Sequence, residues 1–249
     1  MAAALANVDA VIHSAAVTPT MSGVPEADFR LLNTSATAAI AEAARRAGVR
    51  RFIFMSSLRA QAGPTAEHVL TEEMEPKPTD AYGRSKLAAE EELAKLDVDW
   101  VALRLALVCG DGVKGNMAQL IRLARSPYPL PLGSLKGKRS LVSLPNLAAA
   151  VRTVVNASGP LRRPLIVADP VPLTVPQMIR AMRSGLGRKP LLVSVPPLLL
   201  EKLFRLAGSS ESYERLAGQL IGDPSRLLGL GWAPSVSTTD TLAAVARGN

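Results

Sequence analysis

The sequence has a single cysteine and no uninterrupted apolar run long enough to span a bilayer. Cys109 has no second cysteine to pair with, so an internal disulfide and a cysteine-built metal site are excluded. The longest apolar stretch, residues 190–200, is broken by prolines and is shorter than a membrane span. The first residues, MAAALANVDAVIHSAA, lack a basic segment and contain Asp9, unlike a secretory signal. These features predict a cytoplasmic protein.

Aromatic residues are also scarce, at 4% of the chain, whereas positive charge is in excess. Lys and Arg number 29 and Asp and Glu number 21, which gives a net charge of +8 and suits an anionic partner. The charge alone leaves open nucleic acid, an acidic membrane surface and a phosphorylated small molecule. The basic residues form small separated clusters, and no zinc-finger or RNA-binding signature accompanies them. We therefore expect a small anionic molecule as the partner, with no nucleic acid and no membrane.

Short apolar runs alternate with helical patterns in the first part of the chain. This alternation predicts a parallel sheet with helical crossovers, that is, an α/β protein. From residue 111 onward prolines and glycines become dense and the strand rhythm is lost, which predicts a smaller, mostly helical region. The expected strands are 8–15, 50–57, 98–109 and 163–169, and the expected helices are 28–47, 80–96, 116–125, 144–157, 174–186, 197–207 and 240–247.

The segment TDAYGRSKLAAEEEL, residues 79–93, places Tyr82 and Lys86 one turn apart in the first part of a helix. Thr79 or Asp80 can cap this helix. A lysine ammonium close to a phenol favours the phenolate, so the pair is suited to proton transfer. The alternative is a surface pair, with the tyrosine packed and the lysine in solvent.

Ser57 ends the strand FIFMSS, and ligands of parallel sheets bind at the carboxyl ends of the strands. We therefore expect Ser57 to face Tyr82. Considered alone, Ser57 would be interpreted first as a helix-cap or turn serine.

Several ordered motifs together resemble the extended short-chain dehydrogenase/reductase family, in its NAD-dependent sugar-nucleotide epimerase/dehydratase branch. The resemblance implies a Rossmann-type parallel sheet with a small, mostly helical C-terminal substrate region. It divides the chain into a dinucleotide-binding core, 1–110 and 140–168, and an interleaved substrate-binding region, 111–139 and 169–249. The motifs are HSAA (13–16), NTSAT (33–37), FIFMSS (52–57), YGRSK (82–86), LRLALVCGDG (103–112), KRSLVSLPNLAAAV (138–151) and LGWAP (230–234).

The same resemblance implies a role for each residue that matches the family motifs. Tyr82 would be the acid/base, Lys86 would lower its pKa and bind the nicotinamide ribose, and Ser57 would bind the reacting hydroxyl. The alternatives are that Asn33 only holds a loop, that Asn116 caps a helix and that Arg139 is a solvated charge. The implied cofactor contacts are His13, Ala15, Ala16, Asn33, Ser56 and Lys86, and the implied substrate contacts are Asn116 and Arg139.

GDGVKG, residues 110–115, matches the dinucleotide fingerprint G-x-G-x-x-G literally. The fingerprint also needs an acidic residue about 20 positions later, and no Asp or Glu occurs between Asp111 and Asp169. By resemblance, this segment is a substrate-side loop instead. The family's own fingerprint is expected before residue 1, with roughly 60 residues of the family pattern missing, which would leave the strand at 8–15 as an apolar sheet edge.

The function that the resemblance implies is 4-epimerisation of a nucleotide-linked sugar through a transient keto sugar. The cofactor is expected to be NAD, with NADP left open. Dehydration fits less well, because the family's dehydratases have an acidic residue beside the active serine or threonine, where this chain has Leu58 and Arg59. The alternatives are a net dehydrogenase or reductase and a catalytically inactive binding protein. The resemblance also implies a homodimer through helices 28–47 and 80–96, and the alternative is that the small residues at 36–44 pack inside one subunit.

Overall fold

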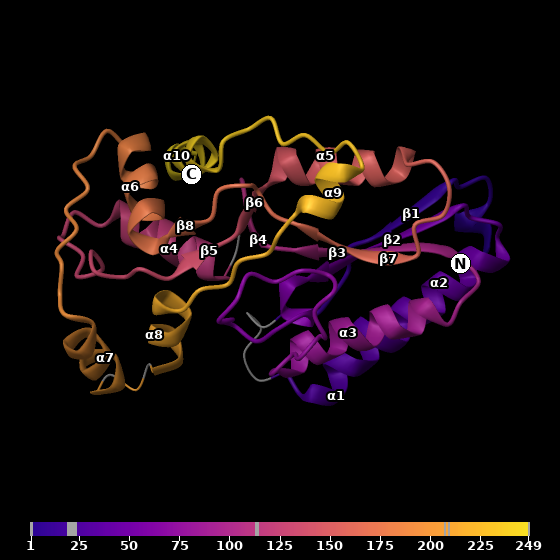
Figure 1. Cartoon of the computed structure of the whole chain (residues 1–249), viewed down its shortest axis with the longest axis horizontal. Helices are drawn as coiled ribbons and strands as arrows, with labels where there is room; N and C mark the ends of the chain where they lie inside the picture. The colour runs from indigo at the N-terminus through magenta and orange to yellow at the C-terminus, as the bar shows by residue number, and fades with distance from the viewer. Residues whose placement is uncertain (1, 19–23, 113–114, 207, 209, 249) are drawn as a thin grey trace.

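The computed structural model describes residues 2–18, 24–112, 115–206, 208 and 210–248, and its centre is a four-stranded parallel sheet (Figure 1). The order β1-β2-β3-β7 confirms the predicted sheet of parallel strands joined by crossovers. β2 and β3 lie in the middle and are almost wholly buried, as expected for continuous apolar runs. The strands are β1 (Ala10–His13), β2 (Arg51–Ser57), β3 (Asp99–Leu105) and β7 (Arg163–Val167).

β1 forms one edge of this sheet. Within the described residues it pairs only with β2, in a register that sets Ile12 opposite Ile53. The side chain of Ile12 is 49% exposed, an unusual value for isoleucine in a parallel sheet. The structure therefore has the apolar edge that the sequence predicted for this strand.

Helices cover both faces of the sheet (Figure 1). On one face a continuous helical run, 26–46, lies beside α3 (Ala81–Ala94). This run contains a π-helical segment, η2 (Arg30–Ser35), between two α-helical parts, α1 (Glu26–Phe29) and α2 (Ala36–Arg46). Such segments are uncommon and often occur at functional sites. The other face is covered by α5 (Leu144–Asn156) and α9 (Ser225–Gly229).

The predicted strand 98–109 is in fact two strands in two sheets. β3 ends at Leu105, and Ala106 still donates its N–H to Val167 of β7, at 3.0 Å. The chain then leaves the central sheet, and β4 (Leu107–Cys109) pairs with β6 (Leu141–Ser143). A continuous apolar run does not reveal such a change of partner, because both strands are buried.

Much of the chain after β3 is built around a second apolar cluster, apart from the core of the central sheet, and α4, α6 and α10 contribute most of it. The predicted helices 116–125, 174–186, 197–207 and 240–247 correspond closely to α4, α6, α7 and α10, whereas α8 and α9 were not predicted. The remaining elements are η1 (Ala2–Leu5), η3 (Leu58–Ala60), α4 (Gly115–Arg125), β5 (Lys138–Arg139), β8 (Leu173–Thr174), α6 (Val175–Gly185), α7 (Pro197–Leu206), α8 (Ser210–Ala217) and α10 (Thr238–Arg247).

A buried ion pair joins the sheet to α3. Arg104 of β3 and Glu90 of α3 each expose 4% of their side chains, and their closest nitrogen–oxygen distance is 2.6 Å. Ser56 of β2 also donates a hydrogen bond to the Glu90 carboxylate, and Arg104 donates another to Gln61. The polar groups of this cluster therefore satisfy one another inside the core.

Candidate active site

The first turn of α3 is held tightly against the chain that follows β2. Asp80 is the N-cap, and its carboxylate accepts a hydrogen bond from Gly83 N at 3.0 Å. A Cβ atom added at Gly83 would lie 2.2 Å from the carbonyl oxygen of Arg59, so glycine permits this close approach. The contact places Tyr82 next to the end of β2, where Ser57 lies.

Ser57 and Tyr82 meet as the sequence predicted. Both side chains line the same cavity, and Ser57 is a hydrogen-bonding neighbour that acts on the pKa of the phenol. Burial raises the pKa of Tyr82, whereas the hydrogen bond from Ser57 and the positive charge of Arg59 lower it; the charge of Asp80 raises it further. The phenol is therefore partly buried, with Ser57 and Arg59 beside it to stabilise its ionised form.

Lys86 is also part of this cluster, but it is placed differently from the expectation. Its side chain is buried, and Nζ donates a hydrogen bond to the Met55 carbonyl at 2.8 Å. Nζ lies 4.5 Å from the centre of the Phe54 ring and 5.9 Å from the centre of the Tyr82 ring. Burial lowers the pKa of Lys86 to about 8, partly opposed by the charge of Glu90.

The structure excludes one alternative for this pair and corrects one expectation. The alternative of a surface pair is wrong, because Lys86 is 2% exposed. The expectation that Lys86 lowers the pKa of Tyr82 needs correction, because burial raises this pKa and the cation that opposes the rise is Arg59. The ammonium of Lys86 is instead bound to the Met55 carbonyl and faces the Tyr82 ring.

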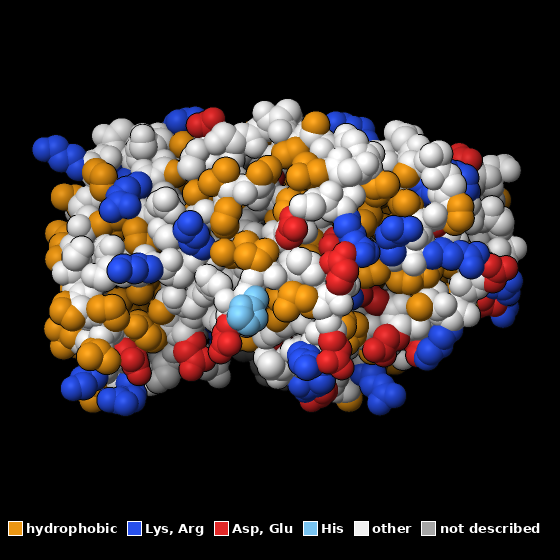
Figure 2. Space-filling model, viewed as in Figure 1, with side chains coloured by type: hydrophobic (Ala, Val, Ile, Leu, Met, Phe, Trp, Pro, Cys, Tyr) orange, Lys and Arg blue, Asp and Glu red, His pale blue; other side chains and the backbone are white. Residues whose placement is uncertain are grey.

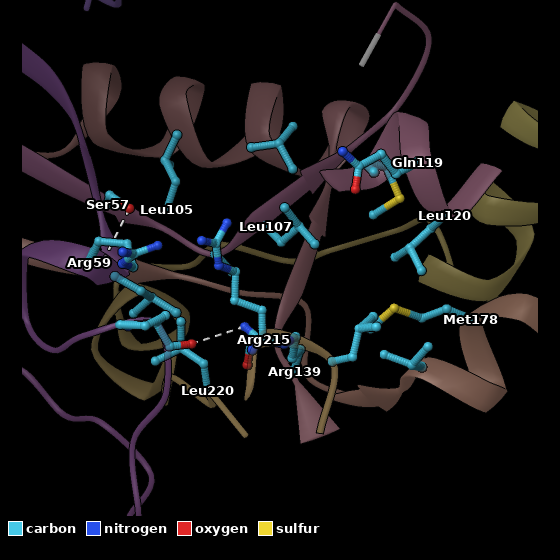
Figure 3. A pocket seen from close by; sticks show the side chains of 18 of the residues that line it. Ser57, Arg59, Leu105, Leu107, Gln119, Leu120, Arg139, Met178, Arg215 and Leu220 are labelled. Atoms are coloured by element: carbon cyan, nitrogen blue, oxygen red, sulfur yellow. Dashed lines mark hydrogen bonds between the residues drawn. The ribbon is translucent and has the colours of Figure 1, made fainter. Parts of the chain in front are cut away.

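A cavity of about 540 Å³ opens beside Ser57 and Tyr82. It lies where β2 and β3 end, next to the second apolar cluster, as expected for a ligand site in a parallel sheet. Its polar lining includes three arginines, and Figure 3 shows Arg59 on the side of Ser57, with Arg139 and Arg215 close together in the middle. The apolar wall includes Leu105, Leu107, Leu120 and Met178.

Arg139 is the arginine that the sequence predicted for this site. Its Nη1 donates to the Pro64 carbonyl at 3.2 Å, while Nη2 is buried and has no hydrogen-bond partner in the described part of the chain. Burial, and then the charges of Arg59 and Arg215, lower the pKa of Arg139 to about 10. A buried guanidinium beside other cations is suited to an anionic ligand. Such a ligand would accept a hydrogen bond from Nη2 and offset the repulsion among the three arginines.

Arg59 and Arg215 are cavity residues that sequence reasoning did not identify as ligand contacts. Arg59 pairs with Asp80 at a closest distance of 2.5 Å, so the helix cap also holds the arginine in place. Arg59 directly follows the SSL sequence at the end of β2, and this position was a usable signal. Arg215 comes from α8, a helix that was not predicted, and nothing in the sequence pattern distinguishes it.

The predicted cofactor residue Asn33 is fully buried and connects three segments. Its side-chain oxygen accepts from Val17 N at 2.8 Å, and its amide group donates to Val17 O and Ser85 Oγ, each at 3.0 Å. Thr34, next in the π-helical segment, donates to Ser85 O at 2.9 Å. Asn33 thus holds the loop after β1 against α3, which matches its alternative role as a loop residue. Contact with a cofactor stays a prediction.

His13 is buried between β2 and α2. Its ring stacks on Phe54, and its Nε2 lies 3.0 Å from Thr37 Oγ1. The Thr37 hydroxyl gives its one proton to Asn33 O at 2.7 Å, so His13 is the donor in the other bond. Burial, and then the charge of Lys86, lower the pKa of His13, which favours this neutral form.

The other predicted contacts do not all converge on the cavity. Ser56 points to Glu90 while Ser57 lines the cavity, because neighbouring residues of a strand face opposite sides. Ala15 is exposed and Ala16 is partly exposed, in the loop that Asn33 holds. The Asn116 side chain lies outside the described residues, so its role stays a prediction.

The comparisons with known proteins agree with this geometry. The model of the NAD dependent epimerase/dehydratase family matches residues 1–166. The chain belongs to this family. A UDP-glucose 4-epimerase from Vibrio cholerae is 35% identical over 241 residues, which cover 92% of this chain and 73% of that protein. An uncharacterized protein of Sinorhizobium fredii is 31% identical over 162 residues, and the chain spans only 40% of its length.

Solved structures confirm the Rossmann-type fold of this family member. The structure of MoeE5 in complex with UDP-glucose and NAD matches with a TM-score of 0.75 and 23% identity. The match covers 99% of this chain and 80% of MoeE5. A UDP-galactose 4-epimerase matches with a TM-score of 0.71 and 23% identity, over 96% of this chain and 76% of that one.

NAD is the cofactor of the family, and the residues described here fit one end of it. Ser57, Tyr82 and Lys86 form a compact polar group at the carboxyl end of the sheet, where the reacting end of a dinucleotide binds in folds of this class. In the described residues, no glycine-rich turn directly follows a strand of the central sheet. GDGVKG follows β4 of the small sheet instead, as expected for a loop that is not the fingerprint.

Proposed function

We propose that this family member catalyses the 4-epimerisation of a nucleotide-linked sugar. The observation that carries the proposal is that Ser57 and Tyr82 lie together at the wall of a cavity that is also lined by three arginines. A proton-transfer group and an anion-binding group then act on two ends of one substrate. The similarity to a UDP-glucose 4-epimerase, at 35% identity, supports this choice of substrate and reaction.

Tyr82, as the phenolate, would take a proton from the sugar hydroxyl and later return it. Because burial raises its pKa, the phenol is neutral in the resting chain at neutral pH, so it must first release its proton to solvent. Ser57 and Arg59 favour the phenolate, so both would stabilise it before it accepts the proton of the sugar hydroxyl. Ser57 would also orient the sugar hydroxyl, and bound NAD would supply the acceptance and return of a hydride at the sugar carbon.

The arginines would bind the diphosphate of the substrate. Arg139 has a free buried donor, and Arg215 is close enough for its charge to lower the pKa of Arg139. A dianion between them would replace this repulsion with two charge-assisted interactions. The cavity volume of about 540 Å³ lies within the usual range of small-molecule sites.

The test of the proposal is to incubate the chain with NAD and either UDP-glucose or UDP-galactose. We expect each sugar nucleotide to be converted into the other, as measured by chromatography, without a build-up of reduced cofactor absorbance. Stoichiometric reduced cofactor would instead show a net dehydrogenase. No turnover of either compound, although NAD binds, would contradict this reaction.

Arg139→Ala should weaken substrate binding more than it slows turnover. We expect KM for the nucleotide sugar to rise by about tenfold or more, because a charged hydrogen bond to phosphate is lost, with kcat changed much less. Lys138→Ala is the matched control, since the neighbouring Lys138 is exposed and does not line the cavity. Equal effects of both substitutions on KM would remove Arg139 from the binding site.

We also propose that the chain forms a homodimer through the helical run 26–46 and α3. Leu31 and Leu32 in this run are 60% and 48% exposed, and a partner copy would cover them. Leu31→Arg should therefore convert a dimer into a monomer in sedimentation velocity experiments. An unchanged sedimentation coefficient would contradict this interface.

A further inference from the structure

Helix α7 has a second apolar stripe that faces away from the protein. Leu200 is 2% exposed and Phe204, one turn later, is partly buried against the second apolar cluster, so these two residues attach the helix. A surface helix normally keeps its opposite side polar. Here that side is apolar as well: Leu198, Leu199, Leu203 and Leu206 are 75%, 50%, 51% and 86% exposed.

The extended segment before α7 continues this exposed apolar surface. Leu192 is bridged to Leu130 and packs against the second apolar cluster. Its neighbours Leu191 and Val193 are 44% and 49% exposed. Figure 2 shows apolar side chains along the left edge and gathered at the lower left, where Figure 1 places α7. We call these six exposed residues of 191–206 the α7 surface.

Positive charge is in excess in the segment that carries the α7 surface. Glu201 is the one acidic residue in 186–206, against four cations, which gives a local net charge of +3 from 4 − 1. All five charged side chains are exposed, and Figure 2 shows Lys and Arg beside the apolar groups at the lower left. The four cations are Arg188, Lys189, Lys202 and Arg205.

This charge decides between the possible occupants of the surface. In a symmetric dimer the same patch of each copy meets itself, so these cations would face cations of like charge. An anionic lipid surface has the opposite charge and an apolar interior. Exposed leucines beside lysine and arginine are the features of helices that lie in the membrane interface.

We propose that the α7 surface binds peripherally to an anionic lipid bilayer, with its leucines in the headgroup region and its cations at the lipid headgroups. This differs from the sequence-based expectation of no membrane partner, which rested on the absence of an apolar run long enough to span. No described helix is both long and apolar enough to cross a bilayer, and surface binding does not need one.

The proposed contact lies one helix away from the candidate active site. α7 packs on α8 through Phe204 and Tyr213, whose ring centres are 5.9 Å apart. α8 in turn contributes Ser212, Arg215 and Leu216 to the cavity. Binding at the α7 surface would therefore bring the cavity close to the bilayer without blocking the residues that line it.

The test is flotation of the whole chain with vesicles of phosphatidylcholine alone or mixed equally with phosphatidylglycerol. We expect binding to the mixed vesicles only, and weaker binding as ionic strength rises. Leu203→Ser combined with Leu206→Ser should lower the partition coefficient by about tenfold or more. Lys202→Gln and Arg205→Gln should each lower it by about fivefold.

Two matched controls test whether the effect is local. Val171→Ser removes an apolar side chain that is 64% exposed, and Lys77→Gln removes an exposed cation, and both residues lie outside the α7 surface. Both should bind vesicles as the unchanged chain does, and circular dichroism should show the same melting temperature for every variant.

Three outcomes would overturn the proposal. They are no binding to the mixed vesicles, equal binding to neutral vesicles, and unchanged binding of the leucine variant. If the unchanged chain does not bind vesicles but forms an oligomer in sedimentation experiments, and the leucine variant does not form it, the α7 surface is instead an interface with a second copy of the chain.

Discussion

Tyr82→Phe should lower kcat for the proposed sugar-nucleotide epimerisation by about 10² to 10⁴. The change removes one oxygen atom, which is the atom that accepts and returns the proton in the proposed reaction. The phenyl ring keeps its edge contact with Phe29, at a centre distance of 6.4 Å, so the packing of α3 is retained. We therefore expect the melting temperature to change little and KM to change less than kcat.

Tyr128→Phe is the matched control for this experiment. Tyr128 is 72% exposed and lies away from Ser57, so the same chemical change there should leave kcat unaltered. Steady-state rates with each sugar nucleotide, together with thermal melts, provide the comparison. Near-normal turnover of Tyr82→Phe would show that another group moves the proton.

Arg104→Met should destabilise the fold by about 3–5 kcal/mol, because it leaves the Glu90 carboxylate buried without its cation. Glu90 would keep the hydrogen bond from Ser56, which is insufficient to compensate a charge inside the core. Urea unfolding measures the loss as a lower midpoint at an unchanged slope.

Two further variants separate charge burial from a general loss of packing. Arg162→Met breaks the exposed pair of Arg162 and Asp97 and should cost less than about 1 kcal/mol. Adding Glu90→Met to Arg104→Met removes the unpaired Glu90 carboxylate and should restore much of the stability. If the double variant is as unstable as the single one, or if Arg104→Met is nearly neutral, burial of a lone charge is not the cause.

The sequence alone predicted the main strands and most of the helices within a few residues. Buried parallel strands are continuous apolar runs and surface helices repeat their apolar residues every third or fourth position, so both patterns are local. The limit of local patterns appears at Ala106, where one apolar run changes sheets. The run would look the same in either sheet, because both of its halves are buried.

The candidate site, like the fold, was predictable from the sequence only in part. The four-residue spacing of Tyr82 and Lys86 and the position of Ser57 at a strand end are visible in the sequence, and the structure brings all three together. The sequence does not show that Lys86 is bound to the Met55 carbonyl, or that the cation acting on Tyr82 is Arg59. Side-chain partners far apart in the chain depend on how the helices and strands pack.

What the sequence determined by itself is therefore the set of strands and helices and the residue types available for chemistry. The tertiary structure decided which charges meet: Arg139 with Arg59 and Arg215 in one cavity, and the apolar stripe of α7 beside its cations at the surface. The physical reason is the separation along the chain over which each kind of interaction acts. Hydrophobic periodicity acts between residues a few positions apart, whereas electrostatic and packing contacts depend on distances that only the folded chain defines.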